Sequence, residues 1–213
     1  MRSFLVFLAL LPFTLVAQER VFFENEFKKS FHTKPKLDVK LDNRFSFIRN
    51  SDVKTIGVKI GLNFNRKFKV GIGINQMLLP VGKQILNEDN LLVPVDLEYF
   101  YVSPYIEYVY FNSKRWEFSL STQLGFGSAS YRDKSNINKK LVESTVLSYE
   151  PALLIDYKII RWFGIGTGVG YRLVYYKSPG VNEKFSSPEY VVKLKIYLGE
   201  IVRTITGKQL EID

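Results

Sequence analysis

Residues 163–175 read FGIGTGVGYRLVY, a segment in which bulky and small side chains alternate. One face carries Phe163, Ile165, Thr167, Val169, Tyr171, Leu173 and Tyr175, and the other carries Gly164, Gly166, Gly168, Gly170, Arg172 and Val174. Side chains alternate between the two faces of a β-strand, so this period of two predicts a strand. In a soluble barrel the glycine face would point to water and the bulky face would fill the core. A glycine face that also carries an arginine instead fits a narrow, charged interior, with the bulky face in lipid.

The glycine series invites comparison with a nucleotide-binding loop. That motif needs two residues between its second and third glycine and a helix after it. Here Gly164, Gly166, Gly168 and Gly170 keep a period of two, and strand residues follow. The segment is therefore interpreted as a strand, with no nucleotide site.

The same alternation recurs along most of the chain. Eight runs are expected at about 37–48, 53–64, 67–76, 97–111, 116–131, 144–157, 162–176 and 188–199. Short connections fall at 65–67, 112–115 and 158–161, longer ones at Met77–Asp96, Arg132–Glu143 and Lys177–Ser187, and the first, at 49–52, is short. Short turns on one rim and long loops on the other are typical of outer-membrane barrels, with the short turns periplasmic. The prediction is an all-β, eight-stranded antiparallel transmembrane β-barrel over residues 37–199.

One run breaks the alternation. In the expected strand 97–111 the apolar parity shifts between Tyr101 and Val102. An extra residue in one strand changes parity in this way. We therefore expect a β-bulge at that point.

Ionisable residues on the inward face form a balanced set. The basic members are Lys40, Arg44, Lys59, Lys69, Arg172, Lys193 and Lys195, and the acidic members are Asp38, Asp42, Glu107, Glu117, Glu150, Asp156 and Glu189. Charges in a poorly hydrated space are tolerated only when paired. Seven residues of each sign therefore predict a network of lumen ion pairs.

Aromatic residues mark the two ends of the expected strands. Phe68, Trp116 and Trp162 follow the short turns, and Tyr99, Tyr101, Tyr171 and Tyr175 lie nearer the long loops. Tyr and Trp concentrate where a membrane meets water. The pattern predicts two aromatic girdles, with basic residues of the short turns near lipid phosphates.

The N-terminal residues have the layout of an export signal. Arg2 precedes an apolar run from Phe4 to Val16, which ends at Ala17. The run has about 13 residues, whereas a spanning helix needs about 20. We therefore expect residues 1–17 to be a signal peptide. Residues 18–36 would follow as a periplasmic segment with a possible amphipathic helix (Phe23, Phe27, Phe31), and residues 200–213 would form a periplasmic tail.

The composition argues against several chemistries. The chain has no cysteine, which excludes disulfides and Cys-based zinc sites. Its single histidine, His32, precedes the first strand, so no imidazole is available on the barrel for acid/base catalysis. The net charge of +9 prompts a nucleic-acid hypothesis, but export argues against it. No enzyme activity, cofactor, metal or nucleic-acid partner is expected. The placement of the basic residues suits lipid head groups, so outer-membrane lipid is the expected partner.

The export signal, the period-two strands and the segment from Arg161 to Arg172 resemble the small outer-membrane barrel proteins of Bacteroidota, broadly OmpA/OmpX-like. The resemblance implies an outer-membrane location with both termini periplasmic. It implies a structural protein, or an accessory subunit that meets a protein partner through its loops or N-terminal segment. Two alternatives stay open, a small porin-like pore and a lipid-modifying enzyme. Eight strands leave room for little more than side chains, which disfavours the pore.

Overall fold

The computed structural model describes residues 28–48, 51–78, 81–86, 92–134, 140–198 and 201. Residues 1–27, and with them the expected signal peptide, lie outside the described residues, as does most of the expected tail 200–213. None of the described segments is a helix with the length and apolar character required to cross a membrane.

Nine strands account for most of the described chain. They are β1 (Lys36–Ile48), β2 (Ser51–Phe64), β3 (Phe68–Met77), β4 (Val81–Leu86), β5 (Leu92–Asn112), β6 (Trp116–Asp133), β7 (Lys140–Ile160), β8 (Phe163–Lys177) and β9 (Ser187–Ile196). Several exceed the 9–11 residues that a tilted strand needs to cross a bilayer.

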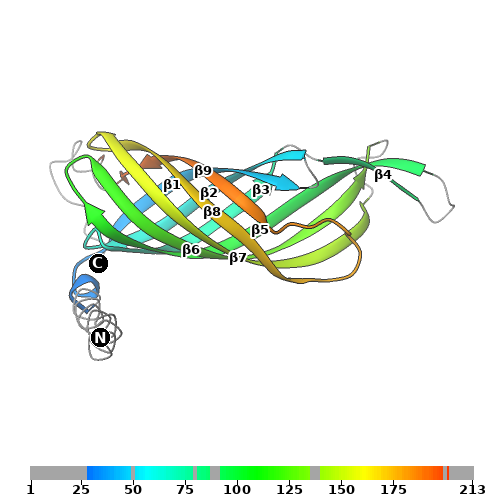
Figure 1. The fold of residues 1–213 in the computed structure, drawn as a ribbon. Helices are drawn as coiled ribbons and strands as arrows, with labels where there is room; N and C mark the ends of the chain where they lie inside the picture. The colour runs from blue at the N-terminus through cyan, green and yellow to red at the C-terminus, as the bar shows by residue number, and fades with distance from the viewer. Residues whose placement is uncertain are drawn as a thin grey trace, which may run out of the picture.

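Eight of the strands form a closed antiparallel ring. The order runs β3-β2-β1-β9-β8-β7-β6-β5, and β3 pairs with β5 to complete it. Closure across the chain ends is made by β1 and β9, in a register that places Leu41 opposite Leu194. Figure 1 shows the tilted strands wrapping around one axis. The ring leaves no free sheet edge in the barrel wall, so its backbone hydrogen bonds are satisfied internally.

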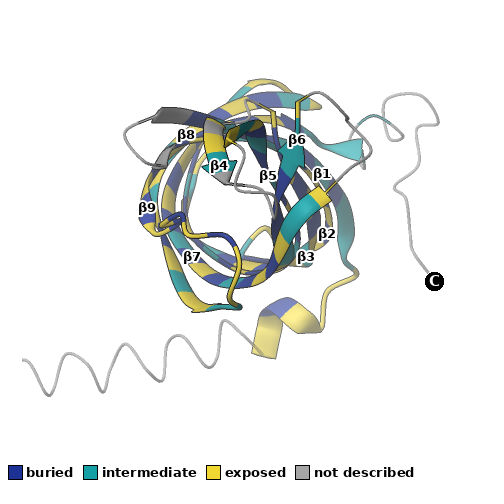
Figure 2. Ribbon diagram, turned by 90° about the vertical axis from the view of Figure 1, so that its right-hand side faces the viewer, coloured by how far each residue is buried: buried dark blue, intermediate teal, exposed yellow. Residues whose placement is uncertain are grey.

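Burial alternates along each barrel strand. In β9 the residues from Ser187 to Lys195 are buried and exposed in turn, and Figure 2 shows the same striping around the ring. The exposed positions are mostly large apolar residues, such as Ile74 at 56% and Val169 at 53% exposed. The buried positions include many charged residues. The barrel is therefore apolar outside and polar within.

The ninth strand, β4, corrects the prediction of a long polar loop over Met77–Asp96. It pairs only with the first part of β5, from Val81↔Leu97 to Leu86↔Leu92. Together they form a hairpin that projects beyond the ring (Figure 1). The sequence pattern missed it because Asn and Asp residues interrupt the alternation in this region.

The bulge expected between Tyr101 and Val102 is wrong. Odd-numbered residues stay buried from Val95 to Val109, so parity does not change there. The register of the β5–β6 pair shifts instead between Val109 and Phe111. Tyr99 and Tyr101 consequently point inward and are 1% and 0% exposed, so neither belongs to an outer girdle.

The residues before β1 lie outside the ring. Residues 28–31 form one helical turn, drawn beside the barrel in Figure 2. The Phe31 ring packs on the outward-facing rings of Phe64 and Phe68, with centroids 4.5 and 6.1 Å apart. This turn is therefore attached to the outer wall and does not plug the lumen.

The connection between β8 and β9 closes the opposite end. Val181 and Phe185 are each 1% exposed and join an apolar cluster inside the barrel that includes Tyr99 and Val146. The rings of Phe185 and Tyr99 lie 5.2 Å apart. The segment expected as a polar external loop thus folds into the mouth of the barrel.

Candidate functional site

The candidate site is the charged interior of the barrel. All fourteen ionisable residues predicted to face inward are buried, and none is more than 4% exposed. All eight strands of the ring contribute to this set, and each presents at least one of these side chains. The period-two geometry of the strands is what aims them at the axis.

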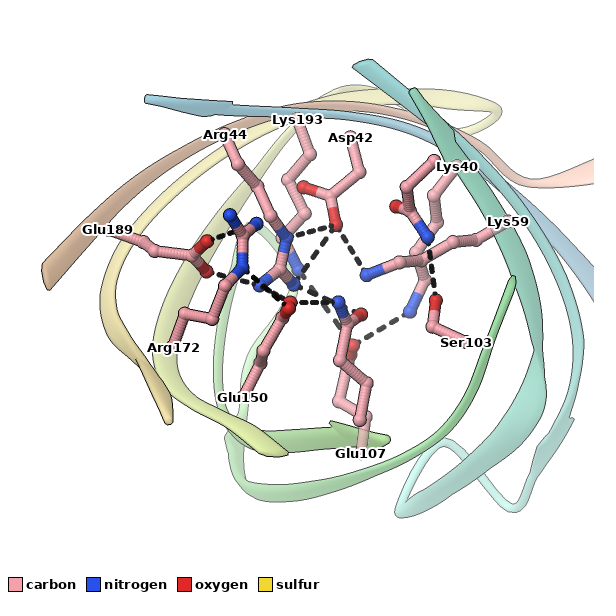
Figure 3. Close-up of polar contacts among 12 residues, drawn as sticks. Lys40, Asp42, Arg44, Lys59, Ser103, Glu107, Glu150, Arg172, Glu189 and Lys193 are labelled. Atoms are coloured by element: carbon pink, nitrogen blue, oxygen red, sulfur yellow. Dashed lines mark hydrogen bonds and ion pairs between the residues drawn. The ribbon is translucent and has the colours of Figure 1, made fainter. Parts of the chain in front are cut away.

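Figure 3 shows an arginine cluster, in which Arg44 and Arg172 face Glu150 and Glu189. Arg172 pairs with Ser187 at the start of β9, so the cluster lies in the part of the lumen nearer the β8–β9 loop. Arg44 donates to Glu189 at 2.7 Å and to Glu150 at 3.1 Å. Arg172 donates to Glu150 at 2.8 Å and lies 2.6 Å from the Glu189 carboxylate. Two guanidinium groups thus share two carboxylates. Forked guanidinium donors suit such shared contacts better than a single ammonium does.

A lysine cluster lies nearer the short turns. Glu107 accepts from Lys40 at 2.7 Å and from Lys69 at 2.8 Å. Lys195 donates to Glu117 at 2.6 Å and to Asp156 at 3.0 Å. Lys69 also contacts Glu117, and Lys193 contacts Asp156. Every carboxylate in the cluster therefore contacts at least two ammonium groups.

Asp42 extends the arginine cluster to Lys59 on β2. It accepts hydrogen bonds from Lys59 and, at 3.3 Å, from Arg44. Removing any one charge would leave its partners buried and uncompensated, which costs far more than an exposed pair would. The interior charges therefore form clusters with shared partners and not a set of independent pairs.

The glycines of β8 make room for this network. A Cβ atom on Gly166 would lie 2.0 Å from the Asp156 carboxylate and 3.0 Å from the Lys193 side chain. The absence of a side chain at this position therefore lets the Asp156–Lys193 pair lie against the barrel wall.

Uncharged residues complete the network, and the sequence pattern did not single them out. Gln123 contacts both Arg44 and Glu150, and the Tyr101 hydroxyl lies 3.3 Å from Glu150. Both residues occupy inward-facing positions of their strands, Tyr101 on β5 and Gln123 on β6, and this alternation could have identified them. For Tyr101 the incorrect bulge assignment gave the wrong face.

One group of three carboxylates within the described residues has the spacing of metal ligands. Glu107, Glu117 and Asp156 place carboxylate oxygens within 4.8 Å of one another. Those carboxylates already contact lysine ammonium groups, so a divalent cation would have to displace the ammonium groups. His32 lies outside the lumen, exposed, and its Nδ1 donates to the Lys28 carbonyl at 2.7 Å.

The predicted girdle residues occupy different environments. Trp116 and Trp162 are exposed at the short-turn end, and Tyr171 and Tyr175 are exposed on β8 toward the other end. Phe68 faces outward but is only 3% exposed, because Phe31 covers it.

Comparisons with known proteins bear on the fold. No protein-family model matches the sequence, and neither does any curated protein. The crystal structure of Neisserial surface protein A aligns with a TM-score of 0.56 at 10% identity, covering 78% of this chain and 97% of that one.

Two further outer-membrane barrels give lower scores. Ail of Yersinia pestis, in complex with the heparin analogue sucrose octasulfate, aligns with a TM-score of 0.47 at 11% identity, covering 76% of this chain and 97% of that one. The N-terminal β-barrel domain of Pseudomonas aeruginosa OprF aligns with a TM-score of 0.45 at 9% identity, covering 76% of this chain and 98% of that one. An origin in Bacteroidota remains a prediction. The chain has the fold of the small eight-stranded outer-membrane β-barrels.

Proposed function

We propose that this protein is a non-enzymatic integral outer-membrane protein whose barrel is a closed anchor. The observation that carries the proposal is the inverted polarity of the barrel, with exposed apolar residues outside and fourteen buried charges inside. An apolar outer band around a polar interior is the arrangement that lipid requires. The partner expected for the outer wall is outer-membrane lipid.

The proposed orientation places the short turns and both termini in the periplasm. The barrel begins at Lys36, opposite Asn63 beside the β2–β3 turn, and ends at Ile196, opposite Phe163 beside the β7–β8 turn. Both ends of the sheet therefore lie at the short-turn rim. Outer-membrane barrels keep their short turns in the periplasm.

The β4–β5 hairpin would then project outside the cell. Within the described residues, β4 pairs with β5 alone and so keeps one edge unpaired. Such an edge is a ready surface for strand pairing with another chain. It supports a role as a structural protein or as an accessory subunit of an envelope assembly.

A pore is the second candidate, and the interior argues against it. The charges in the lumen are paired and at most 4% exposed, and Phe185 and Val181 fill the opposite mouth. Planar-bilayer recordings test this directly. We expect no steady conductance, and a reproducible single-channel step would favour the pore.

Electrophoresis tests the membrane barrel itself. A closed barrel unfolds slowly, so unboiled and boiled samples of the purified protein should migrate differently. Identical migration, together with solubility in the absence of detergent, would contradict the proposal. Unchanged lipid A from expressing cells, measured by mass spectrometry, would remove the lipid-modifying alternative.

A further inference from the structure

A hollow of about 420 Å³ opens at the short-turn end of the barrel. Five basic side chains from different elements line it: Lys36, Arg66, Lys114, Lys158 and Arg161. The volume falls in the range of pockets that hold small molecules, roughly 300–1,000 Å³. The hollow adjoins the occluded charge network, whose Asp38 and Glu117 form part of its lining.

Four of these basic side chains have no carboxylate partner among the described residues. The hollow's two acidic lining residues are Asp38 and Glu117. Glu117 already contacts Lys69 and Lys195 of the lumen network. Within the described part of the chain, Arg66, Lys114, Lys158 and Arg161 form no ion pair with a carboxylate, which leaves the mouth suited to an anion.

The same hollow also presents buried hydrogen-bond acceptors. Asp38 is 1% exposed, and neither of its carboxylate oxygens accepts a hydrogen bond within the described residues. Its nearest charged partner is the Lys40 ammonium at 3.5 Å. The side-chain oxygen of Asn63, 8% exposed, likewise accepts none. Buried acceptors without donors are rare in folded proteins, so a donor is expected in this space.

Arg66 provides a further sign that the rim is specialised. Asn65 and Arg66 occupy the β2–β3 turn with φ of 50° and 57°. Asn tolerates the left-handed region, whereas a long side chain such as Arg is uncommon there. The turn thus keeps an arginine at the rim where glycine would be favoured.

We infer that this hollow binds a phosphorylated amino alcohol, of which phosphoethanolamine is the simplest example. The phosphate would contact the basic rim, with Arg66 as a forked donor. The ammonium group would donate to Asp38 and Asn63 deeper in the hollow. Such a ligand supplies an anion for the basic rim and N–H donors for the buried acceptors. The inference does not depend on which way the barrel faces in the membrane.

Isothermal titration calorimetry on the full chain in an uncharged maltoside detergent tests the inference. Phosphoethanolamine should bind at least about tenfold more tightly than phosphocholine, because phosphocholine has the phosphate but no N–H donor. It should exceed inorganic phosphate by the same factor. A tenfold ratio corresponds to about 1.4 kcal/mol of binding free energy. Equal affinity for the three probes, or no binding of phosphoethanolamine, would overturn it.

Variants locate the binding to this hollow. Asp38→Asn should remove most of the preference for phosphoethanolamine over phosphocholine, and Arg66→Asn should weaken both. Arg115→Asn is the matched control, because Arg115 belongs to a neighbouring short turn, does not line the hollow and donates to Tyr157 at 3.0 Å. Heat-modifiable migration checks that each variant folds. Equal losses for Arg66→Asn and Arg115→Asn would overturn the site.

The same chemistry occurs in a free metabolite and in a phosphatidylethanolamine headgroup. Titrating phosphoethanolamine into protein held in phosphatidylethanolamine or phosphatidylcholine nanodiscs distinguishes these two sources. If the disc lipid weakens phosphoethanolamine binding only in phosphatidylethanolamine discs, the lipid headgroup is the ligand. Equal binding in both discs identifies a free molecule.

Discussion

Arg44 on the first barrel strand donates a hydrogen bond of 2.7 Å to Glu189 on the last, linking residues 145 positions apart in the sequence. The contact spans the seam at which β1 and β9 close the ring. Both side chains are almost fully buried, at 2% and 1% exposed. The seam is therefore joined by charge within the lumen as well as by the backbone ladder.

Replacing Arg44 should destabilise the barrel strongly. Arg44→Met would leave Glu189, Glu150 and Asp42 with fewer compensating charges, and breaking a buried pair costs about 3–5 kcal/mol. Urea unfolding in lipid vesicles, followed by tryptophan fluorescence, measures the loss. Arg132→Met is the control, because its pair with Glu98 is partly exposed and should be worth about 1 kcal/mol or less. Equal losses for the two variants would contradict the network.

A charge on the outer wall should also destabilise the protein. Val169 is 53% exposed on β8. If it faces hydrocarbon near the midplane, Val169→Arg should cost roughly 2–4 kcal/mol, with less cost nearer an interface. Val169→Leu should be nearly silent. Vesicle unfolding in which the arginine variant matches the wild type would exclude a lipid-facing outer wall.

Added volume on the neighbouring inner face should be poorly tolerated. A Cβ on Gly168 would lie 2.3 Å from the Leu153 carbonyl oxygen and 2.6 Å from the Leu154 side chain. Overpacking of this kind costs typically about 1–3 kcal/mol, so Gly168→Leu should unfold at lower urea concentration. Thr167→Leu, on the exposed face of the same strand, is the control and should cost little. A stabilised Gly168→Leu variant would indicate unfilled space in the interior.

The segment before the barrel should be dispensable for folding. Deletion of residues 18–36 removes only the first pair of the β1–β2 ladder, Lys36↔Asn63. It also uncovers Phe68, which Phe31 packs against from outside. We expect heat-modifiable, folded protein with slightly lower stability. Complete loss of the fast-migrating form would show that this segment is required for assembly.

The inward and outward faces of the strands could be predicted because facing is a local property. Each side chain of Gly164–Arg172 alternates with its neighbour, whatever the rest of the chain does, and charge next to glycine identifies the interior. The same rule placed Arg44 and Glu189 inside without indicating that they meet. Aromatic residues were less informative, since Tyr101 can pack on either face, and the bulge was placed incorrectly there.

Features that depend on contacts between distant segments required the tertiary structure. The ring brings Arg44 to Glu189 and gathers Arg66 and Arg161 around one hollow. The connection containing Phe185 has no periodic pattern, so nothing local indicated that it would fold into the barrel mouth. Sequence alone determined which face of most strands is polar, because the pleat repeats every two residues; the exception was the first part of β5, at Tyr99 and Tyr101. Only closure of the sheet decided which charges pair and where space remains, because barrel register and loop packing join residues that are far apart in the chain.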